Sequence, residues 1–339
     1  FVPPDILGHW MPGDYNPGNA DAAIAGELEA DDDRGTDDAI NQRYQAILAS
    51  LHFLPHSDQT MAEIRRDLTE ATHEFESIRS RLDPHQLLRL VDNLDDLHAA
   101  AHTPEVTVEQ LSEYAALRLS STPPIGEPPG DSPLVSFYEF LSLIRPLANG
   151  NELTRQSPAR WKKFIETYPK SPKCEAASLR RARILVRHAA PIPHVRAFHF
   201  PAAPITHGYK QLHSRPDPTK LGDALQAVEA HRTRFPNGRY HRDIDLLQAA
   251  CDSWNGETAR ALKSLTTILA DTDHPELLGD ASLYFAQLME RLLVPSRRPD
   301  LLVAIQQNPD SIIPLKKLAR GDTCLSRLRP LIPWIESRI

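Results

Sequence analysis

The chain has 339 residues, of which 41% are hydrophobic and 24% are charged, and this composition favours a folded protein over a disordered one. Its net charge of −7, together with the lack of any DNA- or RNA-reading motif, argues against a nucleic-acid partner. No stretch contains the roughly 18–20 uninterrupted apolar residues of a membrane-spanning helix. Because the chain begins at Phe1, we expect either a processed mature protein or a shortened one.

Residues 1–35 contain prolines, glycines and isolated large apolar residues without a helical period, and they predict an extended arm ending in an acidic linker. Trp10 lies in this arm and is a candidate contact to a partner. Between residues 36 and 120 the apolar spacing is that of helices, with apolar faces over 40–51, 57–82, 87–97 and 111–119. We therefore predict an all-helical region over 36–120.

A proline-rich segment interrupts this helical pattern. Residues 121–133 contain five prolines and predict a semi-rigid linker. The next segment, 134–147, is apolar on nearly all sides, which predicts a buried helix or one held between the two halves of the chain.

The segment 134–295 repeats a pattern of two helices joined by an aromatic-proline turn. "FIETYPKSPKCEAASLRRARIL" (164–185) and "HRTRFPNGRYHRDIDLLQAAC" (231–251) align when the chain is shifted by 67 residues, which places Ala182 on Ala249. A further shift of 37 residues places Ala224 on Ala261 and Val228 on Leu265. Small residues let two helices approach closely, so this pattern predicts helix pairs that must stack on their neighbours.

Two further segments complete the predicted array. The offset of 67 residues exceeds the offset of 37 because it contains the Pro/His-rich stretch 190–218, which predicts an inserted loop. Loops of this length are usually functional or packed over a surface. Residues 296–339 contain five prolines and predict short helices that cap the end of the array.

Proline-ended helix pairs of about 34–40 residues resemble tetratricopeptide repeats. "FIETYPKSPKCEAASLRRA" is similar to the pattern found in bacterial envelope proteins of this class, and the resemblance covers roughly residues 150–295. It implies an irregular all-α solenoid in a bacterial periplasm or envelope, with a cytoplasmic location as the alternative. The tryptophan, glycine and tyrosine of the strict consensus are largely missing, and the insertion interrupts the array.

The sequence contains none of the common catalytic or cofactor motifs: GxSxG, HExxH, a P-loop, GxGxxG and CxxCH are all absent. The three cysteines are far apart, which excludes a disulfide framework or a CxxC metal site. Neither acidic stretch near the N-terminus has the ligand register of a calcium loop. Seven histidines lie in or near the insertion: His188, His194, His199, His207, His213, His231 and His241. Their irregular spacing does not suit metal binding, so we expect no metal and no cofactor.

A basic face is the better candidate site. Three arginines on one predicted helix are three to four residues apart and share a side, and further lysines and arginines flank the two aromatic-proline turns. Such a surface suits an acidic protein partner, although a solvated face balanced by the acidic half explains it equally well. The candidate residues are Lys162, Lys163, Arg180, Arg183, Arg187, Arg232, Arg239 and Arg242, together with Trp10.

We expect a non-enzymatic scaffold or adaptor subunit that holds protein partners in a larger assembly, because stacked helices offer a long groove whose side chains vary freely. The alternative is an enzyme or sugar-binding protein with a site under the insertion, for which His199, His207, Glu175 and Asp243 are the residues to test. A structural subunit that orders only in its assembly is a third possibility.

The charge distribution bears on the partner as well. Residues 1–150 contain 26 acidic residues against 9 arginines and no lysine, whereas residues 151–339 contain 19 acidic residues against 29 lysines and arginines. This asymmetry predicts that the halves face each other or that each meets a different partner.

Overall fold

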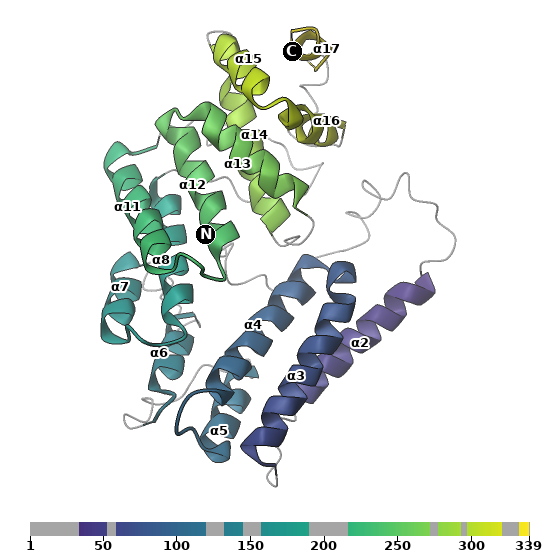
Figure 1. Cartoon of the computed structure of the whole chain (residues 1–339), viewed down its shortest axis with the longest axis vertical. Coiled ribbons are helices and arrows are strands. Elements are labelled where there is room, and N and C mark those ends of the chain that lie inside the picture. The colour runs from purple at the N-terminus through teal and green to yellow at the C-terminus, as the bar shows by residue number, and fades with distance from the viewer. Residues whose placement is uncertain are drawn as a thin grey trace, which may run out of the picture. The chain divides into compact units, whose positions relative to one another are not determined.

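The computed structural model describes residues 34–52, 59–119, 132–144, 157–189, 216–271, 277–292, 297–320 and 332–338. Every regular element in these ranges is helical, which confirms the all-α prediction (Figure 1). The chain divides into two compact units whose boundary falls between Ala177 and Ser178. We call the described residues up to Ala177 the first unit and those from Ser178 onward the second unit.

The first unit consists of helices that pack mainly on their neighbours in sequence. They are α2 (Arg34–His52), α3 (Met61–Ile78), the 3₁₀ turn η2 (Arg79–Arg81), α4 (Pro84–Ala101), α5 (Val108–Leu119), α6 (Val135–Ile144) and α7 (Pro158–Thr167), followed by the start of α8 (Cys174–Ala189). Helix α2 packs on α3, α4 and α5, and α6 packs on α7. No residue of α6 is fully exposed, as its uniformly apolar sequence predicted.

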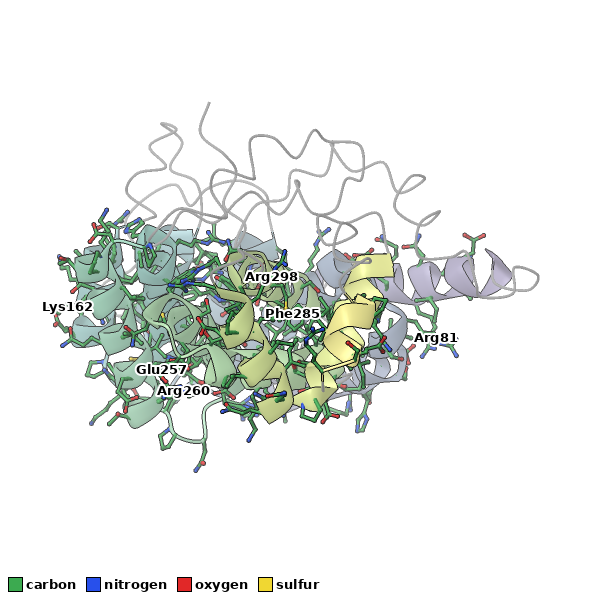
Figure 2. The ribbon with its side chains drawn as sticks, turned by 90° about the horizontal axis from the view of Figure 1, so that it is seen from above. Arg81, Lys162, Glu257, Arg260, Phe285 and Arg298 are labelled. Atoms are coloured by element: carbon green, nitrogen blue, oxygen red, sulfur yellow. The ribbon has the colours of Figure 1, made fainter. Side chains whose placement is uncertain are left out.

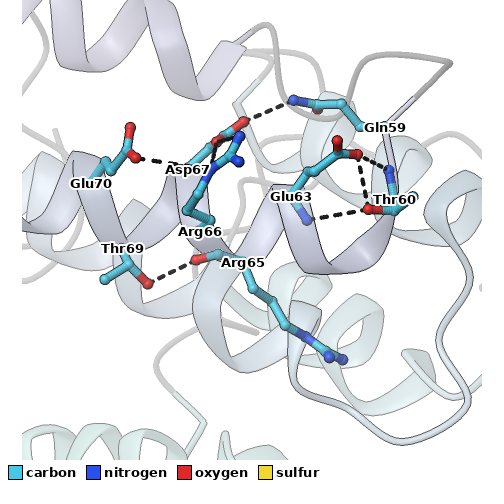
Figure 3. A network of polar contacts seen from close by, with 8 residues as sticks. All are labelled: Gln59, Thr60, Glu63, Arg65, Arg66, Asp67, Thr69 and Glu70. Atoms are coloured by element: carbon cyan, nitrogen blue, oxygen red, sulfur yellow. Dashed lines mark hydrogen bonds and ion pairs between the residues drawn. The ribbon is translucent and has the colours of Figure 1, made fainter.

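The starts of two helices differ from the sequence prediction. Helix α2 begins at Arg34, within the segment 1–35 predicted as arm and linker, and the predicted helix over 57–82 is shorter than expected, running from Met61 to Ile78. The reason for the second difference is a capping box, in which the Thr60 hydroxyl accepts from the Glu63 backbone and the Glu63 carboxylate accepts from the Thr60 backbone (Figure 3). These contacts satisfy backbone donors that a helix start leaves open and so fix the start at Met61.

A buried carboxylate joins three segments of the first unit. The Asp96 side chain on α4 is 3% exposed and accepts from the Tyr114 hydroxyl at 2.6 Å and from Arg118 Nε at 2.5 Å, both on α5. It also forms an ion pair with Lys173, in the turn before α8, whose ammonium lies 5.3 Å from the centroid of the Phe137 ring. The turn is therefore tied to the α4–α5 pair by charge inside the protein.

The second unit continues from α8 with α11 (Pro218–Arg234), α12 (His241–Asn255), α13 (Thr258–Ala270), α14 (Leu278–Leu292), α15 (Arg298–Gln307), η6 (Pro309–Ser311), α16 (Ile312–Arg320) and α17 (Ile332–Glu336). Helix α12 packs on α11 and α13, and α13 packs on α14 and α15, so that neighbours in sequence are also neighbours in space (Figure 1). One apolar cluster, rich in alanine and leucine, runs through these helices.

Three of the helix starts are spaced by the offsets of the sequence alignment, whereas α7, α11 and α13 begin at Pro158, Pro218 and Thr258 and are not. Helices α8, α12 and α14 begin at Cys174, His241 and Leu278, which are 67 and 37 residues apart. Positions matched by these offsets are equally buried: Ala182 and Ala249 are both 0% exposed, and so are Ala224 and Ala261.

The predicted extended arm lies outside the described residues, as do nearly all of the linker 121–133 and of the insertion 190–218. Short helices occupy the described part of 296–339, and their role as a cap stays a prediction. None of the helices in the described part of the chain is both long enough and apolar enough to cross a bilayer.

Candidate functional site

The candidate site is a hollow at the turn between α11 and α12, in the second unit. Its volume is about 270 Å³. The side chains around it are His231, Arg232, Phe235, Pro236, His241, Ile244 and Asp245. The hollow thus falls on the aromatic-proline segment that the sequence repeats.

Local sequence explains why the chain turns here. Phe235 caps α11 with a backbone N–H that donates to the His231 carbonyl at 2.8 Å, and Pro236 cannot continue the helix. Since His231 and Phe235 are four residues apart, their rings meet on one face, with centroids 5.1 Å apart. Helix α12 then begins at His241 after Tyr240, whose side chain forms no capping hydrogen bond.

His231 is the most buried polar residue of the hollow, with 1% of its surface exposed. Burial lowers the pKa of its imidazole to about 4, because the charged form would lose its hydration. The ring is therefore neutral at neutral pH, with one nitrogen able to donate and the other able to accept a hydrogen bond.

Arg232 begins a chain of hydrogen bonds that leads away from the hollow. Its guanidinium donates to Asp245 at 2.7 Å and to the Gln248 oxygen at 3.4 Å. The Gln248 amide then donates to Asp252 at 2.7 Å. Asp252 is 1% exposed and accepts two hydrogen bonds from Arg260, each 2.7 Å long. We call these five residues the polar ladder.

The polar ladder connects three helices, since Arg232 lies on α11, Gln248 and Asp252 on α12, and Arg260 on α13. Arg260, the last residue of the polar ladder, lies near the α12–α13 turn, and Figure 2 shows it close to Glu257. The hydrogen bond to Asp252 raises the pKa of Arg260. Because each charged group meets an opposite charge or an amide, the ladder holds Arg232 in place at the edge of the hollow.

Exposed basic side chains lie on the same turn as the hollow. The Arg234 guanidinium lies 5.5 Å from the centroid of the Phe235 ring, and the Arg239 guanidinium lies 5.4 Å from that of Tyr240. Both arginines are exposed, as is His241. We call Arg234, Arg239 and His241 the rim. The hollow combines phenyl, prolyl and isoleucyl side chains with four polar ones, and it can accept an apolar side chain whose acidic neighbours lie near the exposed arginines of the turn.

Three of the six arginines predicted to bind a partner form ion pairs with acidic residues of the second unit. Arg183 of α8 forms an ion pair with Asp243 of α12, and Arg232 forms one with Asp245. Arg242 lies 3.2 Å from Asp271. The sequence showed the run of cations but not that the acids of the next helix would lie beside them.

The remaining predicted residues are dispersed. Arg180 and Arg187 of α8 are partly buried. On α7, in the first unit, Lys163 is exposed, and Lys162 projects outward and lies 3.7 Å from Glu166 (Figure 2). Glu175 lies in the first turn of α8.

Three of the named candidates, Trp10, His199 and His207, lie outside the described residues. The residues that the structure does describe contain no cluster of three or more His, Cys, Asp or Glu side chains suited to a metal. Cys251 is buried, and burial raises the pKa of its thiol to about 12.

Sequence reasoning missed Ile244, Gln248, Asp252 and Arg260. A signal for part of the polar ladder was present, because Gln248 and Asp252 are four residues apart and amide–carboxylate pairs at this spacing stabilise helices. No spacing rule could have joined Arg260 to Asp252, since the turn between their helices decides that contact.

Comparison of the chain with protein-family models, with curated proteins and with solved structures found no match. No family or homologue is therefore identified by these comparisons.

Proposed function

We propose that this protein is a non-enzymatic scaffold subunit that binds a protein partner at the hollow between α11 and α12. The observation that carries the proposal is a hollow of about 270 Å³ that Phe235, Pro236 and Ile244 line together with polar side chains, at a turn with exposed arginines. Hollows that receive one large apolar side chain are typical anchor points of protein interfaces, whereas surrounding charges give specificity and a faster association.

The partner that fits is a segment with one large apolar residue flanked by Asp or Glu. The apolar residue would pack against Phe235, Pro236 and Ile244. Its acidic neighbours would lie near Arg234 and Arg239, which are exposed. The acidic protein partner expected from the sequence would thus bind at the turn between α11 and α12.

A binding role agrees better with the hollow than a catalytic role does. The His231 ring is neutral because its pKa is depressed to about 4, and Asp245 is held by Arg232. A general base needs a pKa near the working pH and access to a substrate proton. Asp243, a candidate of the enzyme alternative, is held by Arg183.

We further propose that the helix pairs are tetratricopeptide-like repeats of an irregular solenoid. The support is that α8, α12 and α14 begin 67 and 37 residues apart and that alanines at matched positions are equally buried. By the same resemblance we propose a larger assembly at a bacterial envelope as the setting, because proteins with this pattern act there as adaptors.

The test uses a photo-crosslinking amino acid at Asn237, an exposed residue of the turn beside the hollow. The full chain is crosslinked in its native source, and the attached protein is identified by mass spectrometry. The partner is then purified, and its affinity is measured for three forms of the chain: the unchanged protein, Arg234→Glu with Arg239→Glu, and His241→Trp, which fills the hollow from its edge.

Two control variants make the same chemical changes elsewhere. Lys263→Glu with Lys317→Glu reverses two exposed cations of the same unit, and His188→Trp adds the same bulk at an exposed position of α8. We expect the rim reversal and His241→Trp each to weaken binding at least about tenfold and the controls to have little effect. Equal losses in test and control variants, or none, would refute the proposal.

A further inference from the structure

The C-terminal end of α4, in the first unit, carries two histidines four residues apart. His98 lies in the last turn of α4, and His102 follows the residue that ends this helix. The His102 backbone N–H donates to the His98 carbonyl at 3.1 Å, so the helical path continues as far as His102. Both side chains therefore lie on one face of the helix. Neither residue is among the seven histidines in or near the insertion.

The two imidazole rings are close together. Their centroids are 6.0 Å apart, and their planes are tilted by 18°. A metal ion that is bound by a ring nitrogen at about 2.0–2.1 Å lies roughly 3 Å from the centre of that ring. Two rings that share one ion therefore have centres roughly 5–6 Å apart, with the smaller value for a tetrahedral ion. The pair is at the upper end of this range, so binding would draw the rings together by a small movement.

Each ring has one nitrogen that is held by an oxygen atom. His98 Nε2 lies 3.1 Å from the Leu68 carbonyl oxygen and 2.9 Å from the Thr72 hydroxyl oxygen, both on α3. His102 Nδ1 lies 2.8 Å from the His98 carbonyl oxygen. A carbonyl oxygen can only accept, so these two nitrogens carry the hydrogens of the neutral rings. The lone pairs are then at His98 Nδ1 and His102 Nε2. Histidines that bind metals are oriented in this way, by a hydrogen bond from the other ring nitrogen to a carbonyl.

Charges near this helix end act in both directions on a bound cation. The C-terminus of a helix carries a partial negative charge. Asp95 lies three residues before His98 on the same face, and Glu105 follows α4 and is exposed. Against these, Arg65 of α3 donates from Nε to the Ala101 carbonyl at 2.9 Å, which places a positive charge at the same helix end. The balance suits an ion that is bound with moderate affinity and exchanges with solution.

We propose that His98 and His102 together bind one divalent transition-metal ion, Cu²⁺ most tightly and Ni²⁺ and Zn²⁺ less tightly. Imidazole nitrogen is a ligand that suits these ions, and their order follows the general affinity series of the first-row metals. Since the described residues contain no group of three or more His, Cys, Asp or Glu side chains suited to a metal, water would complete the coordination. The site would thus be open, unlike a structural zinc site with four protein ligands.

Hydrogen exchange with mass spectrometry on the full chain locates the ion, which is necessary because the chain contains 15 histidines. Exchange in peptides that cover residues 95–107 is followed as ZnCl₂ is added, and its dependence on concentration gives the dissociation constant of this site. At Zn²⁺ about tenfold above that constant, exchange there should slow about tenfold, because local opening must first release the ion. CaCl₂ should have no such effect, since Ca²⁺ prefers oxygen ligands. CuCl₂ should act at concentrations at least about tenfold lower than ZnCl₂.

Three variants test the ligands. His102→Gln changes an exposed residue and removes one ligand, so zinc should no longer slow exchange over 95–107. His98→Gln keeps a side chain that can donate to α3, and it should lose the effect as well. His241→Gln removes an exposed imidazole of the second unit and should keep the full effect.

The metal proposal is wrong if zinc leaves exchange over 95–107 unchanged, or if calcium slows it equally. It is also wrong if His102→Gln responds to zinc as the unchanged protein does. None of these results depends on the hollow between α11 and α12, so the two proposals stand or fall separately.

Discussion

The buried carboxylate of Asp96 supports the sharpest stability prediction. Replacing Asp96 by Ala removes a negative charge that Arg118 and Lys173 share, and it removes an acceptor of the Tyr114 hydroxyl. The Arg118 and Lys173 side chains are 15% and 11% exposed, so water cannot readily replace the lost contacts. The variant would leave two cations close together in a poorly hydrated space.

The size of the effect follows from these contacts. Removing one partner of a buried ion pair costs about 3–5 kcal/mol, because the other charge is left without compensation. Whole domains are stable by only about 5–15 kcal/mol, so we expect Asp96→Ala to bring the first unit close to unfolding. Lys173→Met should cost less, about 1 kcal/mol, because Asp96 keeps Arg118 and Tyr114.

Urea unfolding followed by hydrogen exchange and mass spectrometry distinguishes the units. Peptides from α4 and α5 should lose protection at a urea concentration about 1–2 M lower in Asp96→Ala, whereas peptides from α12 and α13 should change little. The double variant with Lys173→Met should cost at least about 1 kcal/mol less than the sum of the two single variants. A shift below about 0.3 M for Asp96→Ala would refute the reasoning.

Three further predictions concern single positions, each with a simple measurement. Gly256 ends α12 with a φ of 92°, so Gly256→Ala should lower the free energy of unfolding by about 1 kcal/mol. Gly222→Ala within α11 should raise it by about 0.5–1 kcal/mol, because alanine favours a helix and nothing lies within 4 Å of the new methyl group. Chemical denaturation should therefore shift in opposite directions for the two variants. His231 has a pKa of about 4 in the folded protein, below its usual value near 6.5. The second unit should therefore keep its full stability above pH 6.5 and lose up to about 3 kcal/mol as the pH falls to 4. In melting curves, His231→Gln should remove this pH dependence, whereas His241→Gln should keep it. Thr60→Ala breaks the capping box and should cost about 1 kcal/mol, with exchange of the Glu63 amide rising first.

Most of the helices could be predicted from the helical period of apolar residues in the sequence. The predicted apolar faces over 87–97 and 111–119 became α4 and α5, because those residues alternate with polar ones at the period of a helix that is buried on one side. The offset of 67 residues also corresponds to helix starts, at Cys174 and His241. Period and small-residue spacing are local properties, and a single sequence displays them directly.

Charge was harder to interpret. Asp96 is one of three acids in a short stretch of an acidic region, and nothing in the sequence separates it from Asp92, which lies on the same helix and is exposed. Similarly, Arg183 and Asp243 are 60 residues apart, and only the packing of α8 against α12 brings them together. Whether a charged group is solvated or paired depends on tertiary contacts that composition and spacing do not contain.

The turn at the candidate hollow could be predicted from the sequence, but the enclosed space could not. The repeat drew attention to the segment 231–251 and hence to Phe235 and Pro236, because an aromatic-proline stop between two apolar faces marks a turn. That the turn encloses a space, and that His231 lies buried beside it, depends on how α11 and α12 cross.

The polar ladder also limits how this protein can change over evolution. Gln248 is its only member that both accepts, from Arg232, and donates, to Asp252. Glutamate at this position would repel Asp252, and lysine would repel Arg232, so a single-nucleotide change to either would be selected against while neighbouring surface positions drift. Asp252 and Arg260 should be replaced together or not at all, and descendants of this gene should therefore retain an amide at position 248 for as long as they retain that ion pair.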